Sequence, residues 1–300
     1  MERIIFIGLG AMGEPMAANL LAKGFDLTAV GNRRPEPVAR LREQGAKVAA
    51  DLAEAASGGG IAILMLPSSR EVEAVALGDG GLLASLPAGS VVVDCSTSDP
   101  ESTAALGRKF AARGVAMVDA PVTRGIAGAK QGKLAFFVGG DEADFARVEP
   151  ALSAMGDTFH RMGALGSGHA TKAMTNALSY ATVALVGEML SLGERLGIDL
   201  PVLQEALMSG AASKALESFG PRIIARDYAA PRVTIGNVCT HLAIAESMAA
   251  RAHAQVPVLQ AAEKVYRRVS ALGHDASDMS SIAELWDGPD GAAEAGRAAS

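Results

Sequence analysis

Short apolar runs alternate with helical patterns along the first half of the chain. Apolar runs of strand length occupy 4–7, 27–30, 61–66 and 91–94, and apolar residues at helical spacing occupy 12–23 and 35–43. This alternation is typical of βαβ units, in which helices connect the parallel strands of one sheet. Gly24, Gly45 and Gly114 stand where the C-caps of helices usually fall. The first half therefore predicts an α/β domain built on a parallel sheet.

The pattern changes after about Gly163. Beyond it strand-like runs vanish, and Ala, Leu, Met and Glu recur at helical spacing as far as Leu285. The longest helical pattern, 167–196, is long enough to act as the hinge between two domains and to separate them. We therefore expect the α/β domain over 1–163 and an all-α domain over 164–287, joined by this interdomain helix. The remaining residues, 288–300, have little to bury and are expected to be a flexible tail.

Composition limits the classes of function. With 300 residues, of which 49% are hydrophobic, and a mean hydropathy of +0.23, the chain can bury one large core or two medium ones. The net charge of −6 and the lack of clustered Lys and Arg argue against nucleic acid and anionic membranes as partners. No apolar stretch approaches the ~20 residues of a membrane span, and the N-terminus lacks a secretory signal. These features favour a cytoplasmic protein that acts on a small molecule.

The cysteines and histidines do not indicate a metal site. Cys95 and Cys239 are too few for a disulfide framework, and neither stands at metal-ligand spacing from a histidine. We expect both cysteines to be reduced packing residues, and we predict no metal.

Three glycines directly follow the first apolar run. Gly8, Gly10 and Gly13 have the G-x-G-x-x-G spacing, with a strand before them and a helix after them. In that setting the first glycine permits a tight turn, the second lets backbone approach a pyrophosphate, and the third lets the helix pack on the strand. The helix N-terminus adds a partial positive charge that favours phosphate. The segment predicts a Rossmann-type dinucleotide site made by Gly8, Leu9, Gly10, Ala11, Met12 and Gly13.

The end of the second predicted strand bears on the choice between NAD and NADP. An acidic residue at this point binds the ribose hydroxyls in NAD enzymes, whereas a cation accommodates the 2′-phosphate of NADP. Here the sequence offers Asn32, Arg33 and Arg34 and no carboxylate, and an arginine can bind a phosphate through two hydrogen bonds. We predict a preference for NADP(H), with NAD(H) possible. The alternative is that both arginines are only the solvated start of the next helix.

Four segments together resemble the β-hydroxyacid dehydrogenases, the family of the 3-hydroxyisobutyrate dehydrogenases and several semialdehyde and sulfolactaldehyde reductases. They are GLGAMGEPMAANL (8–20), DCSTSDP (94–100), DAPVTRGIAGAKQGKLAFFVGG (119–140) and GSGHATKAMTN (166–176), and the similarity covers about 4–286. The resemblance implies an N-terminal Rossmann domain and a helical C-terminal domain that closes over it and contributes to contacts in a homodimer or homotetramer. It also implies NAD(P)-dependent interconversion of a short anionic hydroxy acid with an aldehyde or ketone.

The same resemblance assigns roles to single residues. Lys172 matches the family's catalytic lysine, and Asn176 matches its substrate-binding asparagine. Thr97 matches a residue that contacts the nicotinamide, and its neighbour Ser96 is expected to face the substrate. The other matches are the loop under the cofactor, Leu66 and Pro67, and the segment around the substrate carboxylate, Thr123, Arg124 and Gly125.

The chemistry of lysine supports the role of Lys172 independently. Residues 172 and 176 are i and i+4, so on a helix an ammonium and an amide project from one face toward one small molecule. Loss of a hydride from the hydroxyl-bearing carbon requires loss of the hydroxyl proton, which a lysine can take or return. An ordinary lysine pKa of ~10.4 is too high for a base near neutrality, so we expect burial to lower it. The alternative is an ordinary lysine on a solvated helix face.

One departure from the family pattern concerns the substrate. The usual Ser-Gly-Gly is replaced by Thr123, Arg124 and Gly125, in a segment, 119–128, that we interpret as a strand end followed by a glycine-rich loop. A guanidinium adds a full charge and five donors, so we hypothesise a substrate with a stronger or second anionic group, such as a sulfonate, a phosphonate or another carboxylate. The alternative is that Arg124 turns outward or pairs with a carboxylate of its own chain.

A second departure is the pair Thr240 and His241, which replaces the family's usual Lys-Asp. The family's lysine reaches the cofactor, so Thr240 is the expected cofactor neighbour. His241 is either a structural residue or a second proton donor or substrate contact. The second interpretation is based on the charge of histidine, which changes near neutral pH.

Two other functions of the protein stay open. One is imine reduction, which the altered pair favours and Lys172 disfavours. The other is dinucleotide binding without catalysis, whose signature would be a missing lysine.

Overall fold

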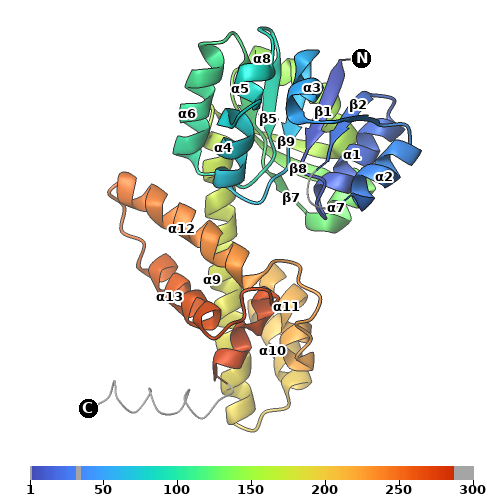
Figure 1. The fold of residues 1–300 in the computed structure, drawn as a ribbon. Helices are drawn as coiled ribbons and strands as arrows, with labels where there is room; N and C mark the ends of the chain where they lie inside the picture. The colour runs from blue at the N-terminus through green and yellow to red at the C-terminus, as the bar shows by residue number, and fades with distance from the viewer. Residues whose placement is uncertain (1, 32–34, 287–300) are drawn as a thin grey trace. The chain divides into compact units, whose positions relative to one another are not determined.

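The computed structural model describes residues 2–31 and 35–286. Two compact units divide the chain, Met1–Lys172 and Ala173–Ser300. Figure 1 shows a sheet flanked by helices in the first unit, and the labelled elements of the second are all helices. The predicted fold class, an α/β domain on a mainly parallel sheet followed by a helical domain, is confirmed. The tail predicted at 288–300 lies outside the described residues.

The first unit is built on one sheet. Its strands are Arg3–Ile7 (β1), Asp26–Val30 (β2), Lys47–Ala49 (β3), Ile61–Leu64 (β4), Val91–Asp94 (β5), Ala116–Asp119 (β6), Val122–Thr123 (β7), Leu134–Gly139 (β8) and Gly156–Gly163 (β9). Within the described residues the strand order is β3-β2-β1-β4-β5-β6-β8-β7, with β9 paired to β8. The strands from β1 to β6 are parallel, and their order along the sheet reverses between β1 and β4. Ligands of such sheets bind outside the carboxyl ends of the strands near this reversal.

Helices of the first unit connect these strands. They are Gly13–Ala22 (α1), Glu36–Glu43 (α2), Leu52–Ser57 (α3), Ser69–Leu77 (α4), Leu82–Ser85 (α5), Pro100–Ala111 (α6), Gly125–Gln131 (α7) and Glu142–Met155 (α8). The predicted C-cap glycines Gly24, Gly45 and Gly114 have φ values of 82°, 101° and 68°, the left-handed conformation that ends many helices. The apolar run 61–66 is a strand only as far as Leu64, because the next residues form the loop that leads to α4.

One expectation about the edge of the sheet was wrong. The segment 119–128 is not a simple loop, because it contains β7 and the start of α7, in which Gly128 is buried. At the same edge β8 runs antiparallel to β6 and β7. Strand β9 was not predicted, because most of its residues are exposed and no apolar run marks it.

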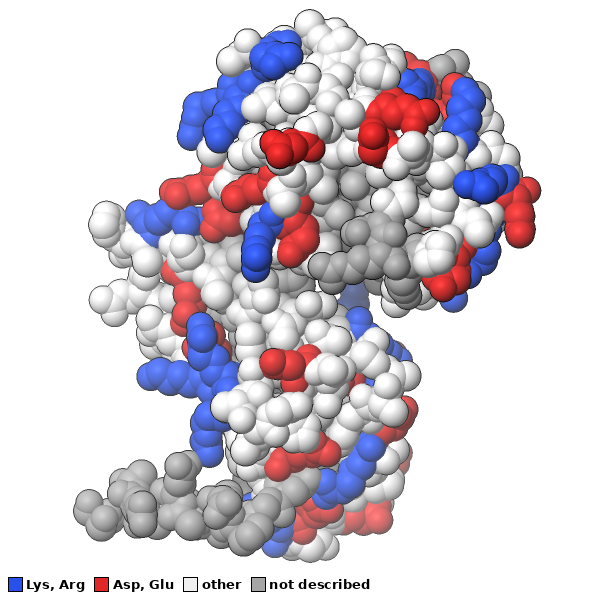
Figure 2. Space-filling view, viewed as in Figure 1, with Lys and Arg blue, Asp and Glu red and all other residues white. Residues whose placement is uncertain are grey.

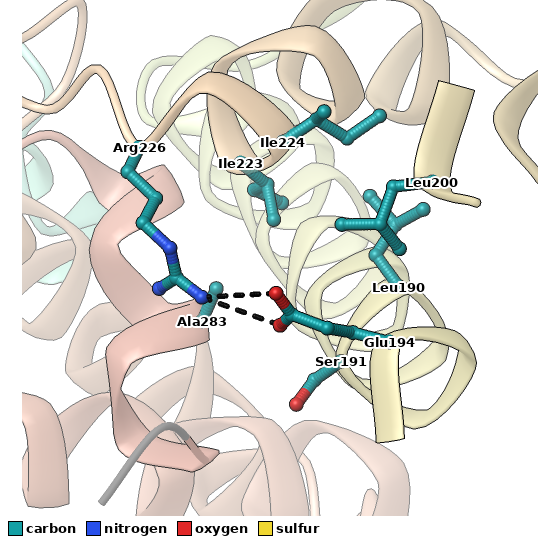
Figure 3. Close-up of a pocket in the computed structure, with 8 residues that line it drawn as sticks. All are labelled: Leu190, Ser191, Glu194, Leu200, Ile223, Ile224, Arg226 and Ala283. Atoms are coloured by element: carbon teal, nitrogen blue, oxygen red, sulfur yellow. Dashed lines mark hydrogen bonds and ion pairs between the residues drawn. The ribbon is translucent and has the colours of Figure 1, made fainter. Parts of the chain in front are cut away.

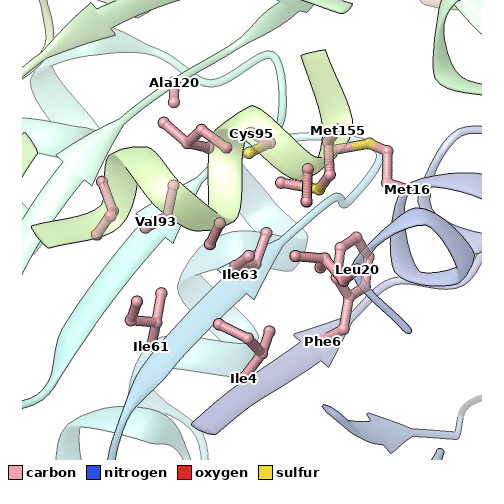
Figure 4. Close-up of a cluster of buried hydrophobic side chains, with 14 of the residues drawn as sticks. Ile4, Phe6, Met16, Leu20, Ile61, Ile63, Val93, Cys95, Ala120 and Met155 are labelled. Atoms are coloured by element: carbon pink, nitrogen blue, oxygen red, sulfur yellow. The ribbon is translucent and has the colours of Figure 1, made fainter. Parts of the chain in front are cut away.

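Apolar side chains cover both faces of the sheet. Ile4 and Phe6 belong to one buried cluster, which Figure 4 shows packed against Leu20 of α1, whereas Ile5 and Ile7 belong to a second cluster. The alternation follows from the two-residue period of a strand. Burial of each such side chain contributes about 1.5–3 kcal/mol. The packing holds α1 against β1 and thereby fixes the glycine turn between them.

The second unit is helical in its described part. It continues Ser167–Arg195 (α9), which begins in the first unit, with Leu200–Ala211 (α10), Lys214–Ala225 (α11), Ile235–Arg251 (α12), Pro257–Ala271 (α13) and a 3₁₀ helix, Met279–Trp286 (η1). Its core brings α9 together with α12, α13 and η1 through residues such as Val183, Leu242, Tyr266 and Ile282. The buried Tyr266 hydroxyl donates a 3.0 Å hydrogen bond to the Tyr180 carbonyl and so ties α13 to the middle of α9.

Both cysteines are free thiols. Cys95 is buried in the main core of the first unit, and Cys239 packs against the core of the second. In the described residues no group of three or more His, Cys, Asp or Glu is arranged to hold a metal ion.

Surface charge is mixed. On the face shown in Figure 2, acidic and basic side chains are interspersed. Among the helices of the described residues, none has both the length and the apolar character needed to cross a bilayer.

Candidate active site

The turn between β1 and α1 has the geometry that the glycine spacing predicts. Gly8 has a φ of 100°, and a Cβ there would collide with the Met65 carbonyl. A Cβ on Gly13 would collide with the Gly8 carbonyl, so the fold itself requires glycine at both positions. A Cβ on Gly10 would meet nothing within 4 Å. Gly10 is therefore not needed for packing within the chain, and the open space beside it fits the close approach of a pyrophosphate.

The other residues of this turn leave the start of α1 available. Met12 occupies the N-cap position of α1, and its side chain makes no hydrogen bond to the first turn. Leu9 and Met12 pack partly on the main core, and Ala11 is exposed. An N-terminus without a side-chain cap suits a phosphate group. Asn32, Arg33 and Arg34, on which the predicted NADP preference depends, lie outside the described residues.

The loops after β4 and β5 are bonded to each other. The Ser96 hydroxyl oxygen accepts the Leu66 N–H at 2.9 Å. Asp94, which is fully buried at the end of β5, accepts the Ser96 N–H at 2.9 Å. The other two residues predicted to lie near the cofactor differ in exposure: Thr97 is half-buried and Pro67 is exposed.

The start of α9 is bonded to the ends of β5 and β6. Asp119, the last residue of β6, accepts the backbone N–H groups of Gly166 and His169, each at 2.7 Å. Amides in the first turn of a helix have no partner within it, so Asp119 caps α9 from another element. The His169 ring lies in the same place, with Nδ1 2.8 Å from the Thr103 hydroxyl and Nε2 3.7 Å from an Asp94 carboxylate oxygen. Asp94, Asp119 and His169 are all fully buried.

Lys172 follows His169 by three residues, about 4.5 Å along the helix axis. The Lys172 side chain is half-buried. Burial lowers the pKa of its ammonium from 10.5 to about 8, because desolvation disfavours the charged form. The neutral amine is therefore accessible near neutral pH, as general acid–base chemistry requires.

Contacts within the first unit connect the glycine turn to the part of α9 that carries Lys172. The loop after β1 packs on the loop after β4 at Gly8, and the loop after β4 is bonded to Ser96 of the loop after β5. Asp94, at the end of β5, faces the His169 ring. The predicted cofactor turn, Ser96 and the start of α9 thus lie along one edge of the sheet, at the carboxyl ends of its strands.

Arg124 does not sit as the substrate hypothesis requires. Its guanidinium donates to the Asp157 carboxylate at 2.6 Å, to the Lys133 carbonyl at 2.8 Å and to the Thr158 hydroxyl at 2.9 Å. Hydrogen bonds from Thr158 and Arg124 lower the pKa of the Asp157 carboxyl. The structure thus has the alternative arrangement, in which Arg124 pairs with its own chain. Its neighbour Thr123 is half-buried on β7, and Gly125 begins α7 in open space.

Asn176 and His241 are brought together in the second unit. Asn176, one turn after Lys172 on α9, is nearly fully buried, and its amide nitrogen lies 3.2 Å from His241 Nδ1 on α12. The Tyr180 hydroxyl lies 2.8 Å from the same nitrogen. Burial raises the pKa of the Tyr180 phenol, so its hydroxyl stays protonated beside the His241 ring. Thr240 is exposed and donates its hydroxyl back to its own helix at 3.0 Å.

Several residues of these networks were not predicted from the sequence. Asp94 and Asp119 each end an apolar strand, and a carboxylate there is costly to bury unless it is hydrogen-bonded, so the pattern did contain a signal. The others are single polar residues in helices, and each has its partner 66 residues away or, for Tyr180, 61 residues away. No spacing rule points to such pairs. These others are Thr103, His169 and Tyr180.

A separate pocket lies within the helical unit. Figure 3 shows that the Arg226 guanidinium points toward the Glu194 carboxylate, 3.2 Å away, across a hollow lined by apolar side chains such as Leu190, Leu200 and Ile223. None of the residues predicted to form the active site lines this pocket. We therefore do not assign this pocket to the candidate active site.

Comparisons with known proteins identify the family. Residues 3–164 match the model of the NAD binding domain of 6-phosphogluconate dehydrogenase, and residues 166–286 match the model of the NAD-binding domain of NADP-dependent 3-hydroxyisobutyrate dehydrogenase. The chain is 36% identical over 299 residues to 3-hydroxyisobutyrate dehydrogenase of Pseudomonas aeruginosa, covering 97% of this chain and 100% of that protein. The chain belongs to the β-hydroxyacid dehydrogenase family. As a member it is a nicotinamide-dependent oxidoreductase.

Other β-hydroxyacid dehydrogenases show the same similarity. The NAD-dependent L-serine dehydrogenase of Pseudomonas aeruginosa is 34% identical over 295 residues, covering 96% of this chain and 98% of that protein. The crystal structure of 3-hydroxyisobutyrate dehydrogenase from Salmonella typhimurium has a TM-score of 0.86 at 25% identity, covering 94% of this chain and 99% of that one. By contrast, an imine reductase from Pseudomonas sp. reaches a TM-score of 0.58 at 20% identity, which shows a likeness of fold alone.

Proposed function

We propose that this β-hydroxyacid dehydrogenase interconverts a short β-hydroxy carboxylate and its semialdehyde or keto form, with Lys172 as the general acid/base. A bound nicotinamide dinucleotide supplies the hydride acceptor or donor. The observation that carries the proposal is the burial of Lys172, which lowers the pKa of its ammonium to about 8, on a helix whose first turn is bonded to the carboxyl ends of β5 and β6.

The lowered pKa gives Lys172 both roles that the reaction needs. In oxidation the neutral amine accepts the proton of the substrate hydroxyl, and in reduction the ammonium donates a proton to the carbonyl oxygen. At pH 7.5 a lysine with a pKa of 10.5 would be neutral in about 0.1% of molecules, whereas a pKa of about 8 makes it neutral in about a quarter of them. Burial therefore raises the supply of the base by roughly two orders of magnitude.

The relatives and the family match support the proposed substrate class. The relatives named above are dehydrogenases of 3-hydroxyisobutyrate and of L-serine, both short carboxylates with a hydroxyl on the third carbon. We propose a substrate of this class. Arg124 is left out of the proposed contacts because its guanidinium is bonded to Asp157. The contacts we propose are Ser96, Thr123, Gly125, Asn176 and, in place of the family's acidic residue, His241.

For the cofactor we propose a preference for NADP(H). The support is the pair Arg33 and Arg34, with Asn32, at the end of β2, where an NAD enzyme would carry an acid. The relatives include an enzyme named as NAD-dependent, so they do not decide the preference. Exchange of both arginines for glutamate should reduce kcat/KM for NADP+ more than for NAD+. An unchanged ratio would refute the assignment.

We also propose that the protein forms a homodimer through α9. Five large apolar side chains repeat along the helix at spacings of three, four and seven, and each is 40% to 73% exposed. A contiguous apolar face of this kind is unusual on a monomer. A two-fold axis across α9 would place the face of one copy on the same face of its partner, since such an interface is self-complementary. The residues are Met174, Leu178, Leu185, Met189 and Leu192.

The two other functions can be separated from this one in a single assay series. In the oxidation assays, purified protein is mixed with NADP+ or NAD+ and with 3-hydroxyisobutyrate or L-serine. In the reduction assays it is mixed with NADPH and with glyoxylate, succinic semialdehyde, methylmalonate semialdehyde, sulfolactaldehyde or a cyclic imine. Nicotinamide absorbance is followed in both. Turnover of a hydroxy acid or of one of the carbonyl acids is the expected result. Turnover of the cyclic imine alone would favour imine reduction. Binding of NADPH without turnover of any compound would favour a dinucleotide-binding protein that lacks catalysis.

A further inference from the structure

The Asp119 carboxylate occupies a closed site. A Cβ on Gly139 of β8 or on Gly168 of α9 would collide with one of its oxygens, so the backbone approaches the carboxylate from both sides. Each oxygen accepts one backbone N–H of the α9 start, at 2.7 Å. A carboxylate so enclosed cannot turn away without breaking both bonds. The first turn of α9 is thus fixed relative to the end of β6.

The His169 ring adds a second restraint, toward α6. The Thr103 hydroxyl is hydrogen-bonded to His169 Nδ1 at 2.8 Å and lies 3.1 Å from the Asp99 carbonyl one turn earlier on α6. Nε2, on the other side of the ring, is 3.7 Å from the Asp94 carboxylate and has no hydrogen-bond partner in the described part of the chain. The ring is therefore held by one specific bond and by the carboxylates that flank it.

Capping alone would not require this ring. The two Asp119 bonds already cap two amides of the helix start, so a buried polar side chain beside them adds cost unless it has another use. What His169 adds is a fixed orientation of the first turn about the helix axis, because the ring reaches sideways to Thr103. Lys172 stands one turn further along the same helix.

We infer that Asp119 and His169 are positioning residues for Lys172. They lock the first turn of α9 against β5, β6 and α6, so that the Lys172 amine is presented at a fixed place beside the loop that carries Ser96. The inference rests on the acid–base role proposed for Lys172. Its physical basis is that a displacement of a catalytic group by about 1 Å can cost on the order of 100-fold in rate.

The first test compares His169→Leu with His169→Asn. Leucine fills the ring's space without a donor, whereas the asparagine amide places an N–H donor near the position of Nδ1. For His169→Leu we expect kcat to fall about 10- to 100-fold, with the KM for the dinucleotide changed by less than about twofold. His169→Asn should recover most of the lost kcat. A purely structural role would lower the melting temperature in both variants without separating their kcat values.

The second readout does not depend on activity. The pH dependence of acylation of the Lys172 amine, followed by mass spectrometry, reports the pKa of that amine directly. In the wild type the midpoint should be about 8, since burial sets it. If the first turn of α9 loosens in His169→Leu, the amine becomes more hydrated and its midpoint moves toward 10.5.

A milder pair of variants covers the case in which His169→Leu does not fold. Thr103→Val removes the hydroxyl that is hydrogen-bonded to His169. Thr182→Val is its matched control, because both threonine hydroxyls bond to the carbonyl four residues earlier and only Thr103 contacts His169. We expect Thr103→Val to lower kcat at least about threefold and to raise the labelling midpoint, and Thr182→Val to change neither.

The outcomes separate the inference from the proposed function. Folded His169→Leu or Thr103→Val protein with wild-type kcat and an unmoved labelling midpoint would overturn the positioning role. A moved midpoint in a protein that turns over no hydroxy acid would uphold the positioning role and refute the proposed function. Equal loss of kcat in Thr103→Val and Thr182→Val would also count against the inference, because only one of them touches the network.

Discussion

The backbone N–H of His169 donates to the carboxylate of Asp119 at 2.7 Å, across 50 residues of sequence. This bond joins the first turn of α9 to the last residue of β6. Asp119 is also the register partner of Asp94 on the neighbouring parallel strand β5, and Asp94 faces the other side of the His169 ring. The position of Lys172 is therefore set by the edge of the sheet as well as by its own helix.

Replacement of Gly10 by alanine should weaken dinucleotide binding and leave the fold intact. A Cβ at Gly10 meets no atom of the chain within 4 Å, so it would occupy the space that we assign to the pyrophosphate. We expect the Kd for NADPH, measured by calorimetric titration, to rise about tenfold or more, which is about 1.4 kcal/mol. Gly210→Ala is the matched control, because Gly210 is also open and lies in α10. Equal affinity of Gly10→Ala and wild type would show that the pyrophosphate lies elsewhere.

Replacement of Lys172 by methionine should stabilise the fold at neutral pH. Burial lowers the pKa of Lys172 from 10.5 to about 8. Below pH 8 the folded and unfolded states both carry the proton, and the folded state bears a penalty of at most about 3 kcal/mol. Between pH 8 and 10.5 the folded state releases its proton first, so wild-type stability rises with pH.

Urea unfolding measures this effect. The free energy of unfolding of Lys172→Met should exceed that of the wild type by on the order of 1–3 kcal/mol at pH 7, and the gain should shrink as the pH approaches 10. A gain that is absent at pH 7, or that grows with pH, would mean that the amine is not desolvated in the folded protein.

Arg124 should prove dispensable for substrate affinity. It has a φ of 78°, a conformation that suits glycine better than arginine, and its exposed ion pair with Asp157 is worth about 0–1 kcal/mol. In Arg124→Gly the relief of strain and the lost pair nearly offset each other, so we expect stability within about 1 kcal/mol of wild type and a KM for the hydroxy acid within about twofold.

Arg226→Gly is the control for that variant. Arg226 also has a positive φ, 51°, and also pairs with a carboxylate on the surface, that of Glu194. Both variants should behave alike in steady-state kinetics. A KM that rises about tenfold in Arg124→Gly alone would restore Arg124 to the substrate site and, with it, the hypothesis of a second anionic group.

The apolar face of α9 predicts the oligomeric state. Wild-type protein should sediment as a dimer or a higher even oligomer at micromolar concentration, and Leu178→Glu, with a charge at a side chain that is 73% exposed, should shift it to monomer. Leu272→Glu places the same charge at another exposed leucine, 63% accessible at the end of α13, and should not dissociate it. A monomeric wild type, or a dimer that Leu178→Glu does not disturb, would contradict the proposed interface.

The sequence predicted those parts of the fold that local rules govern. Short apolar runs located β1, β2 and β5, and helical spacing located α1 and α9, within a few residues, because each of these elements buries apolar side chains. The glycine turn was predictable because Gly8 and Gly13 are required by close backbone contacts. The edge strands β7 and β9 were not, since their pairing depends on neighbours rather than on their own composition.

Residues of the candidate site could be predicted only where they belong to a recognisable sequence motif. Lys172 and Asn176 stand in a recognisable block at helical spacing, but the groups that hold them come from distant segments. His241 reaches Asn176 across 65 residues, and His169 reaches Thr103 across 66. For Arg124 the local sequence suggested a contact that the structure does not contain. Its charge suggested that it binds a ligand, but the fold places Asp157, 33 residues away, against it.

We propose that the amine of Lys172 exchanges the proton of the substrate hydroxyl. The most direct measurement is kcat for the best hydroxy acid as a function of pH, in wild type, Lys172→Met and the exposed-lysine control Lys109→Met. We predict that kcat of wild-type oxidation rises with pH to a plateau, with a midpoint near pH 8. Lys109→Met should have the same kcat and pH profile as the wild type. Lys172→Met should lose about 10²- to 10⁴-fold in kcat while its affinity for NADPH is unaltered. A Lys172→Met enzyme that keeps both the wild-type rate and the wild-type pH profile would contradict the account.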